Sequence, residues 1–208
     1  MDELLNSILI GAPEGIENMQ LPNPTLRDYY RDELDRIFWL NGNVECGAED
    51  LIRMILRCNK EDKGIPTEDR RPIKIFIDSP GGDAVFMWTI INLIKISKTK
   101  IITINYCSAA SAAAEILAAG HERLALPGTH VMIHTGSCAY VGQADVVEST
   151  KKHFDKMNKK ITDTLLANTG IDPKVYKKKA SKDWYMDEEE ALANGVIDRI
   201  VTDLEEIF

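Results

Sequence analysis

The stretch IKIFIDSPGG, residues 73–82, decides the class of fold. Over residues 73–78 isoleucines alternate with other side chains, which is typical of a β-strand. The Ser-Pro-Gly-Gly segment at 79–82 ends this strand sharply, because proline and glycine interrupt regular strand pairing. The apolar residues 84–96 then predict a helix. A strand, a turn and a helix in this order form one unit of an α/β fold.

The same alternation of strand-like and helical segments continues on both sides of this unit. Apolar spacings of three and four residues mark the helices, and β-branched residues mark the strands. Repeated units of this kind predict an α/β fold with largely parallel strand pairing. Further strands are expected at 36–40, 100–106, 131–134 and 196–201, and further helices at 49–58, 111–119, 143–168, from 173 onward and at 191–194.

Residues 1–30 differ from the rest of the chain. Five prolines and glycines between positions 11 and 24 are expected to break any long element there. We therefore divide the chain into an N-terminal arm, leader or mobile loop at 1–30 and one folded domain at 31–208.

The composition excludes several classes of protein. Of 208 residues, 25 are Lys or Arg and 33 are Asp or Glu, and the net charge of −8 argues against nucleic-acid binding. The densest apolar segment, residues 84–94, is about half as long as a membrane span, so no membrane partner is expected. The N-terminus shows no basic region of a secretion signal, and we expect a soluble protein of the cytoplasm.

The cysteines and histidines indicate neither a disulfide framework nor a metal site. No two cysteines form a Cys-x-x-Cys pair, and none has a zinc-ligand spacing to a histidine. Scattered cysteines without a signal peptide are typical of a reducing compartment. The four cysteines are Cys46, Cys58, Cys107 and Cys138.

Two segments that follow strands carry candidate catalytic groups. Gly81 and Gly82 give a tight turn with exposed backbone N–H groups, which can stabilise an oxyanion; the alternative is a plain β-turn. Ser111 is expected to open a helix of small residues, where the helix N-terminus favours a nucleophilic hydroxyl. The alternatives are an N-cap role for Ser111 and a nucleophile at Ser108.

His134 closes an apolar strand and is the candidate general base, with a structural histidine as the alternative. Cys138 follows four residues later, so a Cys–His pair is a further alternative. Spacing does not select the acid that would orient the histidine, because triads are assembled in space. The candidates are Asp78, Asp145, Asp155, Asp183 and Asp198.

Taken together, these motifs resemble the ClpP family of self-compartmentalised serine peptidases. The resemblance rests on Ser-Pro-Gly-Gly at 79–82, Ala-Ala-Ser at 109–111 and Met-Ile-His at 132–134, in this order. It continues through Tyr-Val-Gly-Gln-Ala at 140–144 and Lys-Asp-Trp-Tyr-Met at 182–186.

The resemblance implies a crotonase-like or ClpP-like fold of repeated β-β-α units, with a protruding strand–helix handle at about 135–170. It implies a catalytic triad of Ser111, His134 and Asp183. The backbone N–H groups of Gly82 and Ala112 would form the oxyanion hole. Residues 137–143 correspond to the handle strand, and the substrate would bind along Gly81, Ser137, Cys138, Ala139 and Tyr140.

The resemblance also implies an assembly. Members of the family form heptameric rings that stack in pairs as a tetradecamer around a chamber. An AAA+ unfoldase of the ClpX or ClpA/ClpC type feeds polypeptides into it with ATP, whereas the peptidase itself needs no metal and no cofactor. Residues 1–30 would take the place of the family's axial loop, although their sequence does not match it.

The chain departs from the family pattern at several positions, which indicates a divergent member. Glu115 stands where the family usually has an apolar residue, and we expect it to alter the substrate groove. Lys182 replaces an arginine next to the acid, and Lys74 replaces an aromatic residue of the unfoldase docking surface. The other departures are at 107–108, 112–113, 135–136 and 138–139, with an insertion around 64–71.

We therefore expect a serine endopeptidase that cleaves peptides and unfolded proteins inside a homo-oligomeric chamber. One alternative is crotonase-type acyl-CoA chemistry, which uses carboxylates in place of a Ser–His pair. The other is a catalytically inactive structural ring subunit. The presence of all three triad residues favours the peptidase, since the fold alone does not decide the function.

Overall fold

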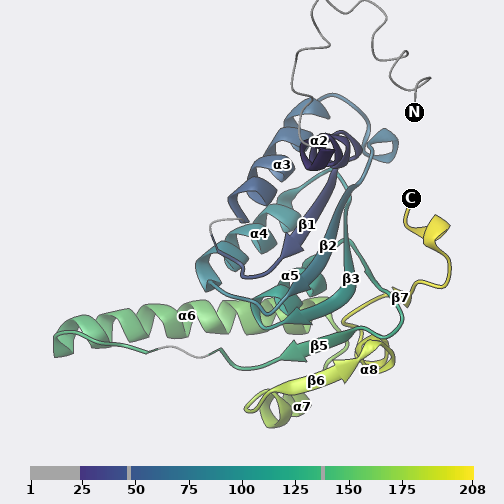
Figure 1. Ribbon diagram of the computed structural model, residues 1–208. Coiled ribbons are helices and arrows are strands. Elements are labelled where there is room, and N and C mark those ends of the chain that lie inside the picture. The colour runs from purple at the N-terminus through teal and green to yellow at the C-terminus, as the bar shows by residue number, and fades with distance from the viewer. Residues whose placement is uncertain (1–23, 46–47, 137–138) are drawn as a thin grey trace, which may run out of the picture.

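The structure, a computed structural model, describes residues 24–45, 48–136 and 139–208. Helices cover a mainly parallel sheet (Figure 1), which confirms the predicted α/β class. The strands are β1 (Ile37–Asn41), β2 (Ile73–Ser79), β3 (Ile101–Ala110), β4 (Glu122–Ala125), β5 (His130–Ile133), β6 (Trp184–Asp187) and β7 (Arg199–Ile200). The helices are α2 (Pro24–Asp35), α3 (Ala48–Glu61), α4 (Ala84–Ile96), α5 (Ala112–Ala119), α6 (Ala144–Asn168), α7 (Pro173–Lys179) and α8 (Glu188–Ala193), with short 3₁₀ turns at Thr67–Asp69 and Leu204–Glu206.

The central strand β3 changes its partner along its length. Its first half pairs in parallel with β4, from Ile102 to Asn105, and its last residues pair in parallel with β5, from Ser108 to Ala110. The main path of the sheet is β1-β2-β3-β4-β7, all parallel. Beyond it, β6 runs antiparallel to β5. The carboxyl end of β3 therefore lies where the sheet branches.

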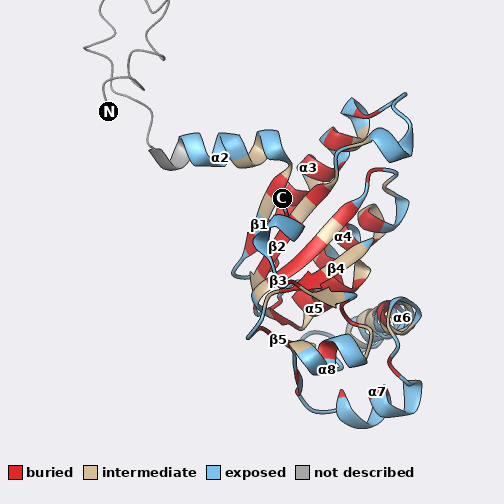
Figure 2. Ribbon diagram, turned by 90° about the vertical axis from the view of Figure 1, so that its right-hand side faces the viewer, coloured by how far each residue is buried: buried red, intermediate tan, exposed pale blue. Residues whose placement is uncertain are grey.

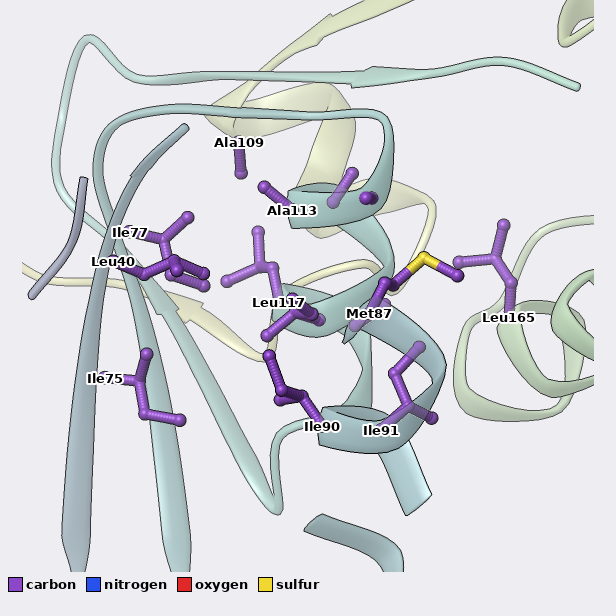
Figure 3. Close-up of a cluster of buried hydrophobic side chains, with 14 of the residues drawn as sticks. Leu40, Ile75, Ile77, Met87, Ile90, Ile91, Ala109, Ala113, Leu117 and Leu165 are labelled. Carbon is purple, nitrogen blue, oxygen red and sulfur yellow. The ribbon is translucent and has the colours of Figure 1, made fainter. Parts of the chain in front are cut away.

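The alternation that predicted β2 matches a sheet that is buried on both faces. Ile75 and Ile77 point toward the helical layer, where Ile90 of α4 and Leu117 of α5 meet them (Figure 3). Phe76 points to the other face and packs with a smaller cluster. That cluster also contains Ile37, Ile104, Leu124, Val201 and Ile207. Burial of this apolar surface on both sides is the main force that holds the sheet and helices together.

Local signals begin the helices that flank the Gly-Gly turn. The carboxylate of Asp83 accepts hydrogen bonds from the N–H groups of Val85 and Phe86, at 2.7 and 2.9 Å, and so caps α4. Helix α5 consists largely of alanines and is buried throughout its first seven residues. Small side chains allow α5 to pack closely against β3 and α4, which brings its N-terminus next to the turn.

The predicted long helix is present, but the strand of the handle is not formed in the described residues. Helix α6 extends well beyond the sheet, and residues 139–143, which lead into it, run alongside (Figure 1). Residues 139–143 lie outside any strand, because the neighbouring helix has its backbone groups already paired and offers no ladder. Ser137 and Cys138 lie outside the described residues.

The N-terminal part of the described chain corrects another expectation. Residues 24–35 form helix α2, which projects from the body, and from residue 27 onward its side chains are mostly exposed (Figure 2). The prediction that prolines break every long element before residue 30 is wrong for this segment, because proline at the first position of a helix is well tolerated. The helix crosses position 30, where the sequence placed the end of the arm.

Two short strands were not expected. Strand β4 contains the charged residues Glu122 and Arg123, and β6 has only four residues, so neither shows a clear apolar pattern. The last strand is shorter than expected, only Arg199–Ile200. No helix among the described residues is long and apolar enough to cross a membrane.

Candidate active site

The Gly-Gly turn after β2 is held tightly against two other segments. The N–H of Val44 donates to the carbonyl of Gly81 at 2.8 Å, and the N–H of Asp83 donates to the carbonyl of Val44 at 2.8 Å. Gly81 has φ +98°, and a Cβ at this position would lie 2.8 Å from the Cβ of Ser111. Only glycine fits this backbone without displacing its neighbours. The turn is therefore a fitted part of the site and not a loose surface loop.

Ser111 lies between β3 and α5 in a strained backbone conformation. Its φ is +53°, a value that side chains other than glycine rarely adopt and that often marks functional positions. Its N–H donates to the carbonyl of Met132 in β5 at 2.8 Å, which fixes the residue at the branch of the sheet. Ser111 is the N-cap residue of α5, yet its hydroxyl makes no capping hydrogen bond. The hydroxyl is directed elsewhere.

The hydroxyl of Ser111 contacts a histidine. Its Oγ lies 2.7 Å from Nε2 of His134, which is hydrogen-bond distance. His134 follows the last residue of β5 directly, and its side chain is 23% exposed. A neutral imidazole at this distance can accept the proton of the hydroxyl.

Asp183 stands on the other side of the histidine at a longer distance. Its Oδ1 lies 3.7 Å from Nδ1 of His134, beyond the range of a hydrogen bond, and its side chain is 57% exposed. It precedes Trp184 of β6, which pairs with Ile133 of β5. The antiparallel pairing thus places the carboxylate beside the imidazole. Catalytic hydrogen bonds are often long in the free state of an enzyme and shorten when substrate binds.

Two backbone N–H groups next to Ser111 are available to a ligand. Gly82 and Ala112 both line the same cavity as the serine. Among the residues that the structure describes, neither of these two N–H groups donates a hydrogen bond. Unpaired N–H groups beside a hydroxyl can bind the oxygen of a polarised carbonyl.

The cavity has a volume of about 360 Å³, in the range of pockets that hold small ligands. Ser111 and His134 form part of its wall, and residues of α6 and α7 also line it. Sequence reasoning did not identify the α6 and α7 residues, since nothing in their local pattern relates them to Ser111. They are Phe154, Asn158, Lys159, Ile161, Thr162 and Tyr176.

Glu115, which the sequence analysis expected to alter the substrate groove, also lines this cavity. The residue is only 9% exposed, and desolvation by burial raises the pKa of its carboxyl to about 8. It is the position where the sequence departs from the apolar residue of the family pattern.

Among the described residues, none of the other candidates forms a hydrogen bond or ion pair with the Ser111 hydroxyl or the His134 ring, and Asp78 lies in β2 opposite Asn41. Ser108 is within β3, opposite His130. Asp198 is bound by Arg123, whose side chain and backbone N–H both donate to it. Asp145 and Asp155 are on α6. Ala139 is exposed, and the ring of Tyr140 lies 6.0 Å from that of Phe154 at the cavity. Within the described parts of the chain, no three His, Cys, Asp or Glu residues form a group that could hold a metal ion.

An α/β fold that holds a serine against a histidine beside two unpaired N–H groups has the arrangement seen in serine hydrolases, a class that includes the serine peptidases. The chain matches the Clp protease family over residues 30–203. It is 34% identical over 139 residues to "ATP-dependent Clp protease proteolytic subunit 2" of Treponema denticola, covering 66% of this chain and 70% of that protein. It is 31% identical over 179 residues to "ATP-dependent Clp protease proteolytic subunit 3" of Synechococcus sp. strain CC9902, covering 84% and 86%.

The chain therefore belongs to the Clp protease family. This confirms the family that the motifs indicated, the ClpP-like fold and the general class of a serine-type protease subunit. At 31–34% identity to these two relatives, the chain is a divergent member.

Proposed function

We propose that the chain is an active serine endopeptidase with Ser111 as nucleophile, His134 as general base and Asp183 as orienting acid. The observation that carries the proposal is the 2.7 Å contact between Ser111 Oγ and His134 Nε2, beside the unpaired N–H groups of Gly82 and Ala112. A serine hydroxyl is a weak nucleophile until a positioned base removes its proton.

In the proposed reaction, Ser111 Oγ attacks the carbonyl carbon of the scissile peptide bond while His134 Nε2 takes the hydroxyl proton. The carbonyl oxygen becomes an oxyanion and accepts hydrogen bonds from the N–H groups of Gly82 and Ala112. The imidazolium of His134 then protonates the leaving amine, and the peptide bond breaks. Water, activated by the same histidine, hydrolyses the acyl-enzyme and restores Ser111.

Asp183 has the supporting role in this scheme. A carboxylate beside Nδ1 keeps the proton on that nitrogen, so that Nε2 is free to accept the proton of Ser111, and it stabilises the imidazolium. The distance of 3.7 Å places Asp183 close enough for a small rotation to form the hydrogen bond.

We also propose the assembly and the partners. The two relatives are named as proteolytic subunits of an ATP-dependent protease. By analogy, this chain forms heptameric rings, stacked as a tetradecamer in the cytoplasm, and receives unfolded polypeptides from a separate AAA+ unfoldase of the ClpX or ClpA/ClpC type. Residues 31–208 are the peptidase domain, and the substrate groove runs along Gly81, Ala139 and Tyr140. Ser137 and Cys138, which the family resemblance also assigns to the groove, lie outside the described residues. The chain itself needs no cofactor for the reaction above.

The test is intact-protein mass spectrometry after treatment with a fluorophosphonate, which reacts covalently with activated serines. Wild type and Ser108→Ala should each gain one adduct per chain, and Ser111→Ala should gain none. Ser108→Ala is the matched control, because it removes the neighbouring serine of β3, three residues before Ser111. Cleavage of a fluorogenic peptide should follow the same order.

Two results would contradict the proposal. An adduct that disappears in Ser108→Ala would move the nucleophile to Ser108. Absence of any adduct in assembled wild-type rings would favour the inactive structural subunit, and acyl-CoA chemistry would then be examined with a panel of thioesters.

A further inference from the structure

A buried carboxyl without a partner lies next to the candidate nucleophile. Glu115 is nine-tenths buried, and its side chain lines the same cavity as Ser111 and His134. Among the described residues, its carboxyl forms no hydrogen bond or ion pair, and its oxygens are open to the cavity and not sealed inside the core. A buried carboxyl normally has hydrogen-bond partners, because desolvation without compensation costs several kcal/mol. An unpaired one that faces a cavity therefore points to a ligand that supplies the partner.

The position of Glu115 on α5 brings it close to the reacting atoms. Its N–H donates to the carbonyl of Ser111 at 3.2 Å, so the two residues are one helical turn apart. Side chains at this spacing lie on the same face of a helix. Ser111 and Glu115 thus face the cavity together, with the N–H of Ala112 between them on the same element.

The surroundings of the carboxyl contain few charges. From α6, Lys159 reaches the cavity wall but is exposed and forms no ion pair with Glu115 within 4 Å. From α7, the hydroxyl of Tyr176 lies 3.3 Å from that of Thr162. Burial is the main cause that raises the pKa of Tyr176, and the negative charge of Glu115 raises it further. From the end of β5, His134 is turned toward Ser111. The remaining contacts of the wall are mostly apolar, with Met87 of α4 and Phe154 of α6 among them.

We infer that Glu115 selects an arginine or lysine side chain on the substrate residue whose carbonyl is attacked by Ser111. That side chain begins one carbon from the reacting centre, so it enters the cavity that opens beside Ser111. A cation there would supply the missing partner of the carboxyl, and a guanidinium could bind both oxygens at once. The inference rests on the proposed peptidase function and adds the side chain that the site prefers.

The preference should depend on pH in a defined direction. Burial raises the pKa of Glu115 to about 8, so the free carboxyl is mostly neutral at pH 7 and mostly ionised at pH 9. The guanidinium stays charged over this range. The ratio of the reaction rates with arginine and with leucine at this position is therefore largest at pH 9. At pH 7, one unit below that pKa, this ratio should be smaller by up to about tenfold.

The test uses peptidyl diphenyl phosphonates in which phosphorus takes the place of the attacked carbonyl carbon. The probes differ only in the side chain on the carbon next to phosphorus, which is that of arginine, leucine or glutamine. Ser111 Oγ attacks phosphorus, its proton passes to His134, and phenol leaves. Intact mass spectrometry gives the rate at which each probe forms its adduct on the chain, without any turnover of a substrate. For wild type at pH 9, the arginine probe should react roughly thirtyfold or more faster than the leucine probe. This ratio corresponds to the lower end of the loss expected when one partner of a buried charge pair is removed.

Variants separate charge from shape. Glu115→Leu should reverse the order of the arginine and leucine probes, and Glu115→Gln, which keeps the size of the side chain, should remove most of the arginine advantage. If Glu115→Leu does not fold, the Gln variant decides. Glu189→Gln makes the same chemical change at an exposed position of α8 and should keep the wild-type ratio.

The outcomes distinguish the two proposals. If a simple fluorophosphonate labels Ser111 but the leucine or glutamine probe reacts as fast as the arginine probe, the inference about Glu115 is overturned and the peptidase function stands. An arginine advantage that survives Glu115→Gln also overturns it. If the simple fluorophosphonate fails to label Ser111, the proposed function fails and this inference fails with it.

Discussion

The two halves of the candidate triad are built differently. The Ser111–His134 half has a contact of 2.7 Å, and the backbone of Ser111 is tied to β5 and packed against the Gly-Gly turn. The His134–Asp183 half spans 3.7 Å, and the carboxylate is more than half exposed on a short connection before β6. The core fixes the nucleophile and the base, whereas elements at the periphery carry the acid.

The precision of the candidate site depends on how closely each residue is packed. Close packing leaves a buried residue few alternative positions, while an exposed side chain keeps its rotamer freedom. The tight half should thus be sensitive to small changes of shape. The loose half should be more tolerant in the free chain and should gain order when substrate or neighbouring subunits cover it.

The largest effect is expected from removal of the base. His134→Ala leaves Ser111 without a proton acceptor, and we expect kcat/KM for a fluorogenic peptide to fall by roughly 10⁴- to 10⁶-fold. His130→Ala, which truncates an exposed histidine of the same strand, is the control and should stay near wild type. A loss of less than about tenfold in His134→Ala would remove this residue from the triad.

The next effect comes from the turn that packs against the nucleophile. Gly81→Ala would place a Cβ 2.8 Å from the carbonyl oxygen of Ala110 and from the Cβ of Ser111. The neighbours must move, and a shift of about 1 Å at the reacting groups costs roughly 10²-fold in rate. Gly128→Ala has a similar positive φ of +79° but open space around it, so it should lower stability slightly and leave kcat/KM unchanged. Equal losses in both variants would show that backbone strain alone is responsible.

A smaller effect is expected at the acid. Asp183→Asn should reduce kcat/KM by between about tenfold and a hundredfold, well below the ~10⁴-fold that the same change causes at a buried triad aspartate. Asp155→Asn, an exposed position of α6, serves as the control. If kcat/KM of Asp183→Asn falls by as much as 10⁴-fold, the His134–Asp183 half is as tight as the Ser111–His134 half in the working assembly, and the two halves do not differ.

The smallest effect on the site is expected from a charge pair at the opposite end of the sheet. The guanidinium of Arg36 donates to both oxygens of Asp62 at 2.8 and 2.7 Å, and the Thr99 hydroxyl donates to the same carboxylate at 2.6 Å. The Asp62 side chain is only 2% exposed. Asp62→Asn should lower the free energy of unfolding by about 3 kcal/mol while the labelling rate of Ser111 stays unchanged.

The same pair predicts a pH dependence of stability. Hydrogen bonding by Arg36 lowers the pKa of Asp62 in the folded state. The contribution of Asp62 to the free energy of unfolding is therefore complete above the ordinary carboxyl pKa of about 4. It is lost as the pH falls through the lower pKa that Asp62 has in the folded state. The stability difference between wild type and Asp62→Asn, measured by denaturant unfolding, should shrink on acidification, and Asp69→Asn on the exposed 3₁₀ turn should show no such trend.

The sequence predicted the parts of the site that depend on local pattern. Alternation in 73–78, the apolar run of α4 and the small residues of α5 each indicate one element, and the two candidate groups Gly82 and Ser111 lie at their ends. The choice of Asp183 among five aspartates depended on family resemblance. It requires the pairing of β6 with β5, and a strand of four residues gives too short an alternation to predict.

The cavity could not be predicted from the sequence either. Its wall combines α4, α5, α6 and α7, and contacts between helices far apart in the chain leave no spacing that can be read locally. Glu115 is the exception, because a single charged residue in an otherwise apolar helix is visible in the sequence. What the sequence could not show was its burial or the absence of a partner.

Strand β5 has a consequence for how the candidate site responds to warming. Its carbonyl at Met132 holds Ser111, His134 follows its last residue, and its pairing with β6 carries Asp183. All three residues therefore depend on one strand of only four residues, which pairs with β3 on one side and with β6 on the other. Local opening of such a segment requires less free energy than global unfolding. Fraying of β5 would therefore disassemble the site below the melting temperature, and its amides should exchange with deuterium ahead of those of β2.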